Sequence, residues 1–262
     1  MNNTKERPII FNTQEVCGAL DRCKTHHRVI IKNVPHGSIA LGQRTLLVNR
    51  DGIERWHWLD DGKTHLVYGN EFKCPFGKVG DRLWVKESFI PDPPAGHDAW
   101  EDEDSFTNYY SWDGCGSKLS EIPKRLRKPE HVIYKVRWTN PDSMIWVSAS
   151  RMRKWASRLL LEITNIRIER IQEISRADAL GMGLKQLSKD GGRTYKYGLP
   201  DTDGLPGTDN IGWHWSDWDS DHKKAVARLW DSIHGKGAWE RNDWVWALKF
   251  KVVKDKGDRN DR

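Results

Sequence analysis

The chain has 262 residues, of which 31% are charged, and carries a formal net charge of +6, with a pI of about 9.1 and a mean hydropathy of −0.77. No stretch approaches the ~20 apolar residues of a membrane-spanning helix, and the N-terminal segment lacks the apolar core of a secretion signal. We therefore expect a cytoplasmic protein with no membrane partner. The four cysteines are scattered, which favours reduced thiols over a zinc site. Fifteen tryptophans beside a positive net charge are typical of proteins that bind nucleic acid.

The first predicted elements are a short strand at residues 8–11 and a helix that Asn12 or Thr13 can cap. A basic segment, residues 24–28, follows the helix and leads into an apolar strand at 29–31. Cationic and hydroxyl side chains at such a junction either converge on an anion or a polar ring, or form a solvated basic turn.

Residues 36–73 are predicted to be an insertion. Turn signals such as Asp51-Gly52 separate short apolar segments and indicate a small antiparallel meander that carries Trp56 and Trp58. His57 and His65 have no carboxylate or thiol partners at ligand spacing, so we predict no metal.

Residues 74–89 predict a turn that leads into a half-buried strand. Leu83 and Val85 alternate with Arg82, Trp84 and Lys86, which is the period of two expected of a strand with one open face. That face either offers an indole and cations to a nucleic-acid base or is an ordinary solvated surface.

Residues 90–130 are polar and rich in turn signals, so a second insertion is predicted there. A short strand at 133–136 and a long strand at 159–171, with a break near Asn165, follow it. Between them lies the densest group of cations around an aromatic residue in the chain: Arg151, Arg153, Lys154, Trp155 and Arg158. This group is either a phosphate-binding and stacking surface or a buried Trp155 covered by arginine side chains.

The last third begins with a helix at 173–181 that Ser175 can cap, followed by a third insertion at 185–222. The insertion ends in Trp213, Trp215 and Trp218, which form either a lid or a packed plug. A helix at 222–234 that Gly235 ends, a closing strand at 244–253 and a disordered tail at 254–262 complete the chain. The apolar face of that helix is predicted from Ala225, Val226, Leu229, Trp230 and Ile233.

Short strands interleaved with three helices, without a βαβ rhythm, predict an α+β fold around a small β-barrel. Six motifs follow one another along the chain: Lys24-Thr25-x-x-Arg28, residues 80–87, residues 155–158, residues 174–179, residues 229–233 and residues 244–246. Their order and spacing resemble the ASCH domain family, which is similar to PUA domains, and above all its long bacteriophage and prophage members that are sometimes labelled morphogenetic proteins.

The resemblance covers residues 8–253 and implies one domain, a PUA-like β-barrel with flanking helices and the three insertions near 36–73, 90–130 and 185–222. It also implies a cleft beside Lys24 that binds RNA or a modified nucleoside, without a cofactor. We expect phosphate and base contacts from Lys24, Thr25, Arg28, Trp84, Lys86, Arg153, Trp155 and Arg158.

The resemblance leaves two alternatives to binding. Some small bacterial members remove an acyl group from acetylated cytidine with a lysine, a threonine and a glutamate. Lys24 matches the lysine, but His27 and Met182 occupy the other two positions, so a hydrolase acting on an acylated nucleoside or on RNA would need Lys24, His27 and Glu87 as its working groups. The morphogenetic label implies an assembly factor that binds a phage or host protein through the Trp-rich insertions.

Overall fold

The computed structural model describes residues 4–32, 34, 45–48, 54–59, 66–91, 124, 127–138, 145–208 and 211–255. The chain folds into two compact units, each made of segments that lie far apart in the sequence. Unit 1 comprises residues 1–5, 21–82 and 162–251, and unit 2 comprises residues 6–20, 83–161 and 252–262.

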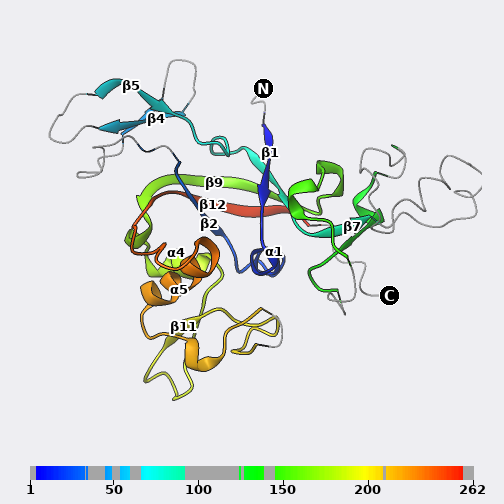
Figure 1. Cartoon of the computed structure of the whole chain (residues 1–262), viewed down its shortest axis with the longest axis vertical. Coiled ribbons are helices and arrows are strands. Elements are labelled where there is room, and N and C mark those ends of the chain that lie inside the picture. Colours follow the sequence, from blue (N-terminus) through cyan, green and yellow to red (C-terminus); the bar gives the residue numbers. More distant parts are fainter. Residues whose placement is uncertain are drawn as a thin grey trace, which may run out of the picture. The chain divides into compact units, whose positions relative to one another are not determined.

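The protein has a mixed α+β fold with a multi-stranded sheet and few helices, as the sequence predicts at this level (Figure 1). In unit 2, β1 (Glu6–Ile10) is the neighbour of β6 (Arg82–Lys86), and β6 is the neighbour of β9 (Leu159–Arg170). In unit 1, β9 is the neighbour of β12 (Trp244–Asp255), which pairs antiparallel with β2 (His26–Ile30). The strand order is therefore β1-β6-β9-β12-β2.

Strand β9 is continuous over twelve residues, with a change in its alternation at the predicted break. Leu159, Leu161 and Ile163 are buried, then Thr164 and Asn165 are both exposed, and burial resumes at Ile166 and Ile168. Two consecutive exposed residues shift which positions face the core, because side chains on a strand alternate with a period of two. The break near Asn165 is thus a change of phase within one strand.

In the described part of unit 1 the helices are α4 (Arg176–Gly181) and α5 (His222–His234), and both begin at caps. Ser175 accepts a hydrogen bond from the amide of Asp178, as predicted, and Asp221 caps α5 through the amide of Lys223. These helices pack with β10 (Lys185–Leu187) and β11 (Lys196–Gly198) around one core: Ile174, Ala179, Met182, Leu184, Tyr197, Leu199, Ala225, Val226 and Leu229. Ile233, expected on the apolar face of α5, is instead 42% exposed.

The Trp-rich end of the 185–222 segment supports the packed-plug interpretation. Trp218 is 2% exposed, and its indole Nε1 donates to the carbonyl of Trp213 over 3.1 Å. Trp213 itself packs against the core of α4 and α5. Trp215 lies in a short 3-10 turn, η7 (Trp215–Asp217), and is half-buried.

The predicted meander in residues 36–73 is confirmed as three antiparallel strands, β3 (Thr45–Val48), β4 (Glu54–Leu59) and β5 (Leu66–Phe72). The structure does not describe the side chains of Trp56, His57 and Trp58, and His65 lies outside the described residues.

Among the residues that the structure describes, unit 2 contains α1 (Thr13–Leu20). Asn12 caps this helix by accepting from the amide of Glu15, while the Glu15 carboxylate accepts from the amide of Asn12. Strands β7 (Phe89–Pro91) and β8 (Val132–Tyr134) pair antiparallel, near the short turns η2 (Pro129–His131), η4 (Ala149–Arg151) and η5 (Lys154–Ala156). Another short turn of this kind, η6 (Ile171–Glu173), follows β9 in unit 1. Most of the predicted 90–130 insertion, and the tail beyond Asp255, lie outside the described residues. None of the helices described here has the length and apolar character needed to cross a membrane.

Candidate functional site

The sequence-predicted site residues divide between the two units. Unit 1 holds Lys24, Thr25, His27 and Arg28. Unit 2 holds Trp84, Lys86, Glu87, Arg153, Trp155 and Arg158.

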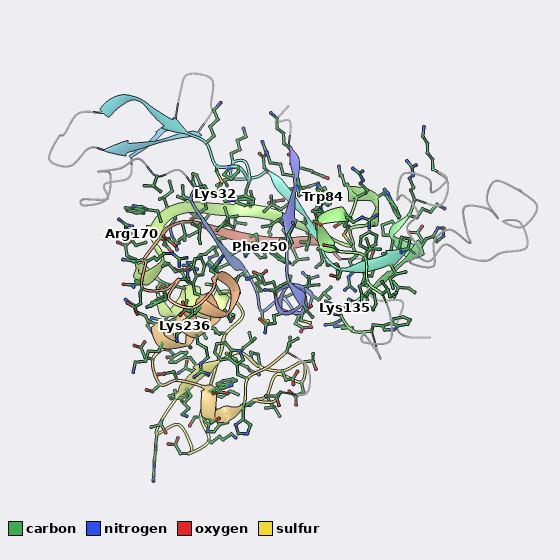
Figure 2. The ribbon with its side chains drawn as sticks, viewed as in Figure 1. Lys32, Trp84, Lys135, Arg170, Lys236 and Phe250 are labelled. Atoms are coloured by element: carbon green, nitrogen blue, oxygen red, sulfur yellow. The ribbon has the colours of Figure 1, made fainter. Side chains whose placement is uncertain are left out.

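The open face of β6 in unit 2 has the predicted alternation. Leu83 and Val85 are fully buried, whereas Arg82, Trp84 and Lys86 are half-buried. The Lys86 ammonium lies 5.8 Å from the centre of the Trp84 ring and also donates to the carbonyl of Ser150 (Figure 2 labels Trp84). An indole that is partly open beside a cation is the combination that stacks bases in single-stranded nucleic-acid sites.

Arg153 adds a second positive charge beside this face. Burial lowers the pKa of Lys86, and the nearby Arg153 guanidinium lowers it further. A lysine whose charge is disfavoured by burial and by a neighbouring cation is a favourable place for a bound anion, because the anion relieves the repulsion. We call Trp84, Lys86, Ser150 and Arg153 the β6 cation–indole surface.

Trp155 and its neighbour Lys154 have different roles. Trp155 is half-buried and packs against the core of unit 2, which contains Phe89, Val132, Tyr134, Met152 and Ala156. Lys154 is 62% exposed and forms an ion pair of 2.8 Å with Glu6. The predicted cluster around Trp155 therefore combines structural packing with an exposed charged rim.

Arg158 and Glu87 lie inside unit 2. The Arg158 guanidinium donates from Nε to Oε1 of Glu87 over 2.9 Å and from Nη2 to Oε2 over 2.8 Å, and both residues are at most 2% exposed. The guanidinium also stacks 4.1 Å from the centre of the Tyr134 ring. This two-point pair joins the residue that follows β6 to the residue that precedes β9, so both side chains have a structural role in unit 2.

In unit 1, burial alternates along the basic segment. Lys24, His26 and Arg28 are buried, whereas Thr25 and His27 are half-buried. Within β2 this alternation places His27 on the face opposite His26 and Arg28. The Lys24 ammonium is 2% exposed and donates to the carbonyl of Met182 over 3.3 Å.

Arg28 lies at the centre of a buried ionic network. Its Nε and Nη2 donate to Oε1 of Glu169 over 3.0 and 2.6 Å, and Nη2 lies 3.3 Å from Oδ2 of Asp178. Arg167 donates to the same two carboxylates, over 2.9 Å to Asp178 and 3.2 Å to Glu169. The Arg28 side chain is 0% exposed, and its Nη1 has no hydrogen-bond partner among the described residues. The network ties together β2, β9 and α4.

Burial and the neighbouring charges shift the pKa of Asp178 in opposite directions. Burial alone would raise its pKa, but the Ser175 hydrogen bond, Arg28 and Arg167 outweigh burial and lower it. Asp178 is therefore a stable carboxylate at the start of α4, where the helix dipole also favours a negative charge.

His26 completes the network as a neutral group. Burial lowers its pKa to about 4, although the Asp178 carboxylate acts to raise it. Its Nδ1 lies 2.9 Å from the Thr25 hydroxyl, and its Nε2 lies 3.3 Å from Oδ1 of Asp178. We assign the proton to Nε2, because Nδ1 can then accept from the Thr25 hydroxyl while the N–H lies beside the carboxylate.

Sequence reasoning named Lys24 and Arg28 as site residues but not His26, Arg167, Glu169 or Asp178. A period of two across Lys24, His26 and Arg28 was the available signal, because it places all three on one face of a strand. No comparable pattern in the sequence predicts that Glu169 lies against that face.

Among the side chains that the structure describes, no three His, Cys, Asp or Glu residues gather in a way that could hold a metal ion. Comparisons of the chain with protein-family models, with curated proteins and with solved structures gave no match.

Proposed function

We propose that the protein is a PUA-like module of the ASCH type, as found in phages and prophages, that binds single-stranded RNA or a modified nucleoside. The observation that carries the proposal is the β6 cation–indole surface of unit 2. There the half-buried Trp84 lies beside Lys86, whose pKa is lowered by burial and by the positive charge of Arg153. The basic pI of about 9.1 also favours a polyanionic partner.

In this proposal an unpaired base stacks on Trp84, and a neighbouring phosphate binds between Lys86 and Arg153. The hydrogen bond from Lys86 to Ser150 fixes the ammonium beside the ring before RNA arrives. Single-stranded RNA fits better than a duplex, because stacking on a protein side chain requires a base that is not already paired and stacked.

The polar face of unit 1 is the proposed place for a modified base. A buried donor without a partner costs free energy, and Nη1 of Arg28 is such a donor. A base carbonyl oxygen would satisfy it. Because Arg28 is 0% exposed at its side chain, binding there requires movement of covering groups.

We place binding ahead of hydrolysis for a geometric reason. Lys24 donates to a backbone carbonyl, and within β2 His27 lies on the face opposite His26 and Arg28. Glu87, the proposed replacement carboxylate, has both oxygens bonded to Arg158. A hydrolase needs a group that can exchange a proton with the reacting atoms, and these contacts do not favour that role.

The test is titration of a fluorescent single-stranded RNA at two salt concentrations. Trp84→Ala should weaken binding about 5- to 150-fold, since stacking one base contributes roughly 1–3 kcal/mol. Lys86→Gln should lower the slope of log affinity against log salt by about 0.7, the value for one phosphate on a single strand.

Lys154→Gln is the matched control, because Lys154 is exposed in the same unit but is paired with Glu6. Its affinity for RNA should remain within about twofold of the wild type. Equal binding by the wild type, Trp84→Ala and Lys86→Gln would overturn the proposal, as would the absence of RNA binding by the wild type at low salt.

A further inference from the structure

A second group of cations around an indole lies in unit 1, where the β10–β11 hairpin meets η7. The ammonium groups of Lys189 and Lys196 lie 4.7 and 5.2 Å from the centre of the Trp215 ring. Lys189 is exposed, and Lys196 and Trp215 are half-buried. We call these three residues the hairpin cation–indole surface.

The acidic residues nearest in sequence are engaged by other groups. Within the hairpin, the Asp190 carboxylate accepts from the Ser188 hydroxyl over 2.7 Å and from the Thr194 amide over 2.9 Å, as well as from the Thr194 hydroxyl. In η7, Asp217 forms an ion pair of 2.9 Å with Arg228. The two lysines are therefore placed against an aromatic ring rather than against these carboxylates, which leaves their charges available to an anion.

The indole has a rigid support. The Trp215 ring centre lies 5.5 Å from that of the buried Trp218. Trp218 in turn packs so closely on Gly198 that a Cβ there would lie 2.4 Å from the Trp218 ring. Trp215 is thus held against a packed base. A pre-positioned aromatic side chain loses little conformational freedom when a ligand stacks on it.

We propose that the hairpin cation–indole surface is a second contact surface for single-stranded RNA. A base stacks on Trp215, and Lys189 and Lys196 bind the phosphates on either side of it. The inference rests on the proposed RNA binding of the β6 cation–indole surface, but it uses different residues in a different unit. RNA fits this surface better than an acidic peptide does, because every base has a π-face to stack, whereas aspartate and glutamate side chains have none.

The experiment uses the full chain and a labelled single-stranded RNA, with the Lys189→Gln/Lys196→Gln double variant and the Trp215→Leu variant. The double variant should lower the slope of log affinity against log salt by about 1.4, or roughly 0.7 for each phosphate. Trp215→Leu should weaken binding about 5- to 150-fold. If Trp215→Leu disturbs folding, as circular dichroism would show, the double variant decides, because it changes only surface charge.

Lys185→Gln is the control, since Lys185 is exposed in β10 and donates to the carbonyl of Gly204 rather than lying over Trp215. It should leave the salt slope unchanged. If the double variant binds RNA with the affinity and salt slope of the wild type while Trp84→Ala still weakens binding, this inference is overturned but the proposed function is not. If the hairpin variants weaken RNA binding and Trp84→Ala does not, the inference is supported and the β6 cation–indole surface is excluded as an RNA-binding site.

A polyglutamate competitor separates the two classes of anionic partner. It should displace RNA from the wild type only at a much higher concentration than an unlabelled single-stranded RNA of the same charge. Equal competition would overturn the assignment of RNA to this surface, because charge alone would then account for the binding.

Discussion

Arg158 and Glu87 form a buried pair with two parallel hydrogen bonds of 2.9 and 2.8 Å between residues 71 positions apart in the sequence. The guanidinium is enclosed on another side by the Tyr134 ring, whose hydroxyl donates to the carbonyl of Ala156 over 2.9 Å. An arginine that sequence composition assigns to a nucleic-acid surface is thus part of the interior of unit 2.

The first prediction is that removing either partner of this pair destabilises the protein strongly. Glu87→Ala should lower the free energy of unfolding by about 3–5 kcal/mol, because it leaves the guanidinium of Arg158 buried without its counter-charge. Urea denaturation followed by tryptophan fluorescence measures the change.

The double variant Glu87→Ala/Arg158→Ala provides a sharper check of the pair. The free energy of unfolding that the double variant loses should be smaller than the sum of the losses of the two single variants, because no unpaired charge remains. Lys154→Ala, which breaks the exposed ion pair with Glu6, should cost less than about 1 kcal/mol and serves as the control. If the stability losses of the Glu87 and Arg158 single variants add up to the loss of the double variant, the two side chains are not paired.

The second prediction concerns His26 and acid. Its pKa is about 4 in the folded protein and 6.5 in the unfolded chain, so between these values the unfolded chain binds a proton that the folded protein does not. Stability should therefore fall as the pH is lowered from about 6.5 to 4, by roughly 2–3 kcal/mol from this group. Below about 4 the depressed pKa of Asp178 adds a further loss, since its stabilising charge is then neutralised.

Urea denaturation across this pH range, on the wild type and on His26→Phe, isolates the histidine. The phenyl ring keeps the shape of the imidazole but cannot titrate, so the slope between pH 6.5 and 4 should flatten even if the variant is less stable throughout. A wild-type slope that persists in His26→Phe would show that another group titrates there.

The third prediction is that Gly181 cannot carry a side chain. A Cβ at this position would lie 1.9 Å from Nδ1 of His26, closer than any real contact. Gly181→Ala should displace the imidazole from Thr25 and Asp178 and cost about 1–3 kcal/mol in stability, the usual range for overpacking.

Two variants control for the effects of helix position and of an added methyl group. Ser175→Ala removes the cap of the same helix and should cost about 1 kcal/mol. Gly181→Ala combined with His26→Ala should recover part of the Gly181→Ala loss, since the clashing ring is gone. If the double variant recovers nothing, the contact with His26 is not the cause.

The fourth prediction is that Asp231 orders the turn after α5. Its carboxylate accepts from the amides of Gly237 and Trp239 over 3.0 and 2.8 Å, and these bonds lower its pKa. Asp231→Ala should speed hydrogen exchange at these two amides by at least tenfold while amides in the centre of β12 remain protected. Unchanged exchange at Gly237 and Trp239 would mean that backbone packing alone holds the turn.

Local features of the fold follow from the sequence because their causes are local. The bounds of α5 and the cap at Ser175 depend on neighbouring residues, and the alternation of Leu83, Trp84 and Val85 depends on strand geometry alone. The exposure of Ile233 was not foreseen, because its position on the helix face does not reveal how far the core extends.

The candidate site was less predictable because its contacts join distant parts of the chain. Lys86 lies over Trp84, as two residues on the same open face of a strand can, and the charge of Arg153 lowers the pKa of Lys86 although the sequence grouped Arg153 with Trp155. The burial of Arg158 and the network from Arg28 to Glu169 and Asp178 depend on which carboxylates the fold brings near, and composition carries no information on that pairing. The lysines around Trp215 lie on either side of a hairpin whose pairing is visible only in the structure.

Strands β6, β9 and β12 each begin in one unit and end in the other, which constrains how the chain acquires its fold during synthesis. Unit 1 needs residues up to 251 and unit 2 needs residues from 252 onward, so neither is complete until the last strand has left the ribosome. The earliest segments, β1 and α1, must wait for partners that are synthesised much later. Such distant pairings slow folding, because a long loop must be closed before each pairing can form. For the same reason neither unit corresponds to a continuous segment of the chain, because each is interrupted by residues of the other.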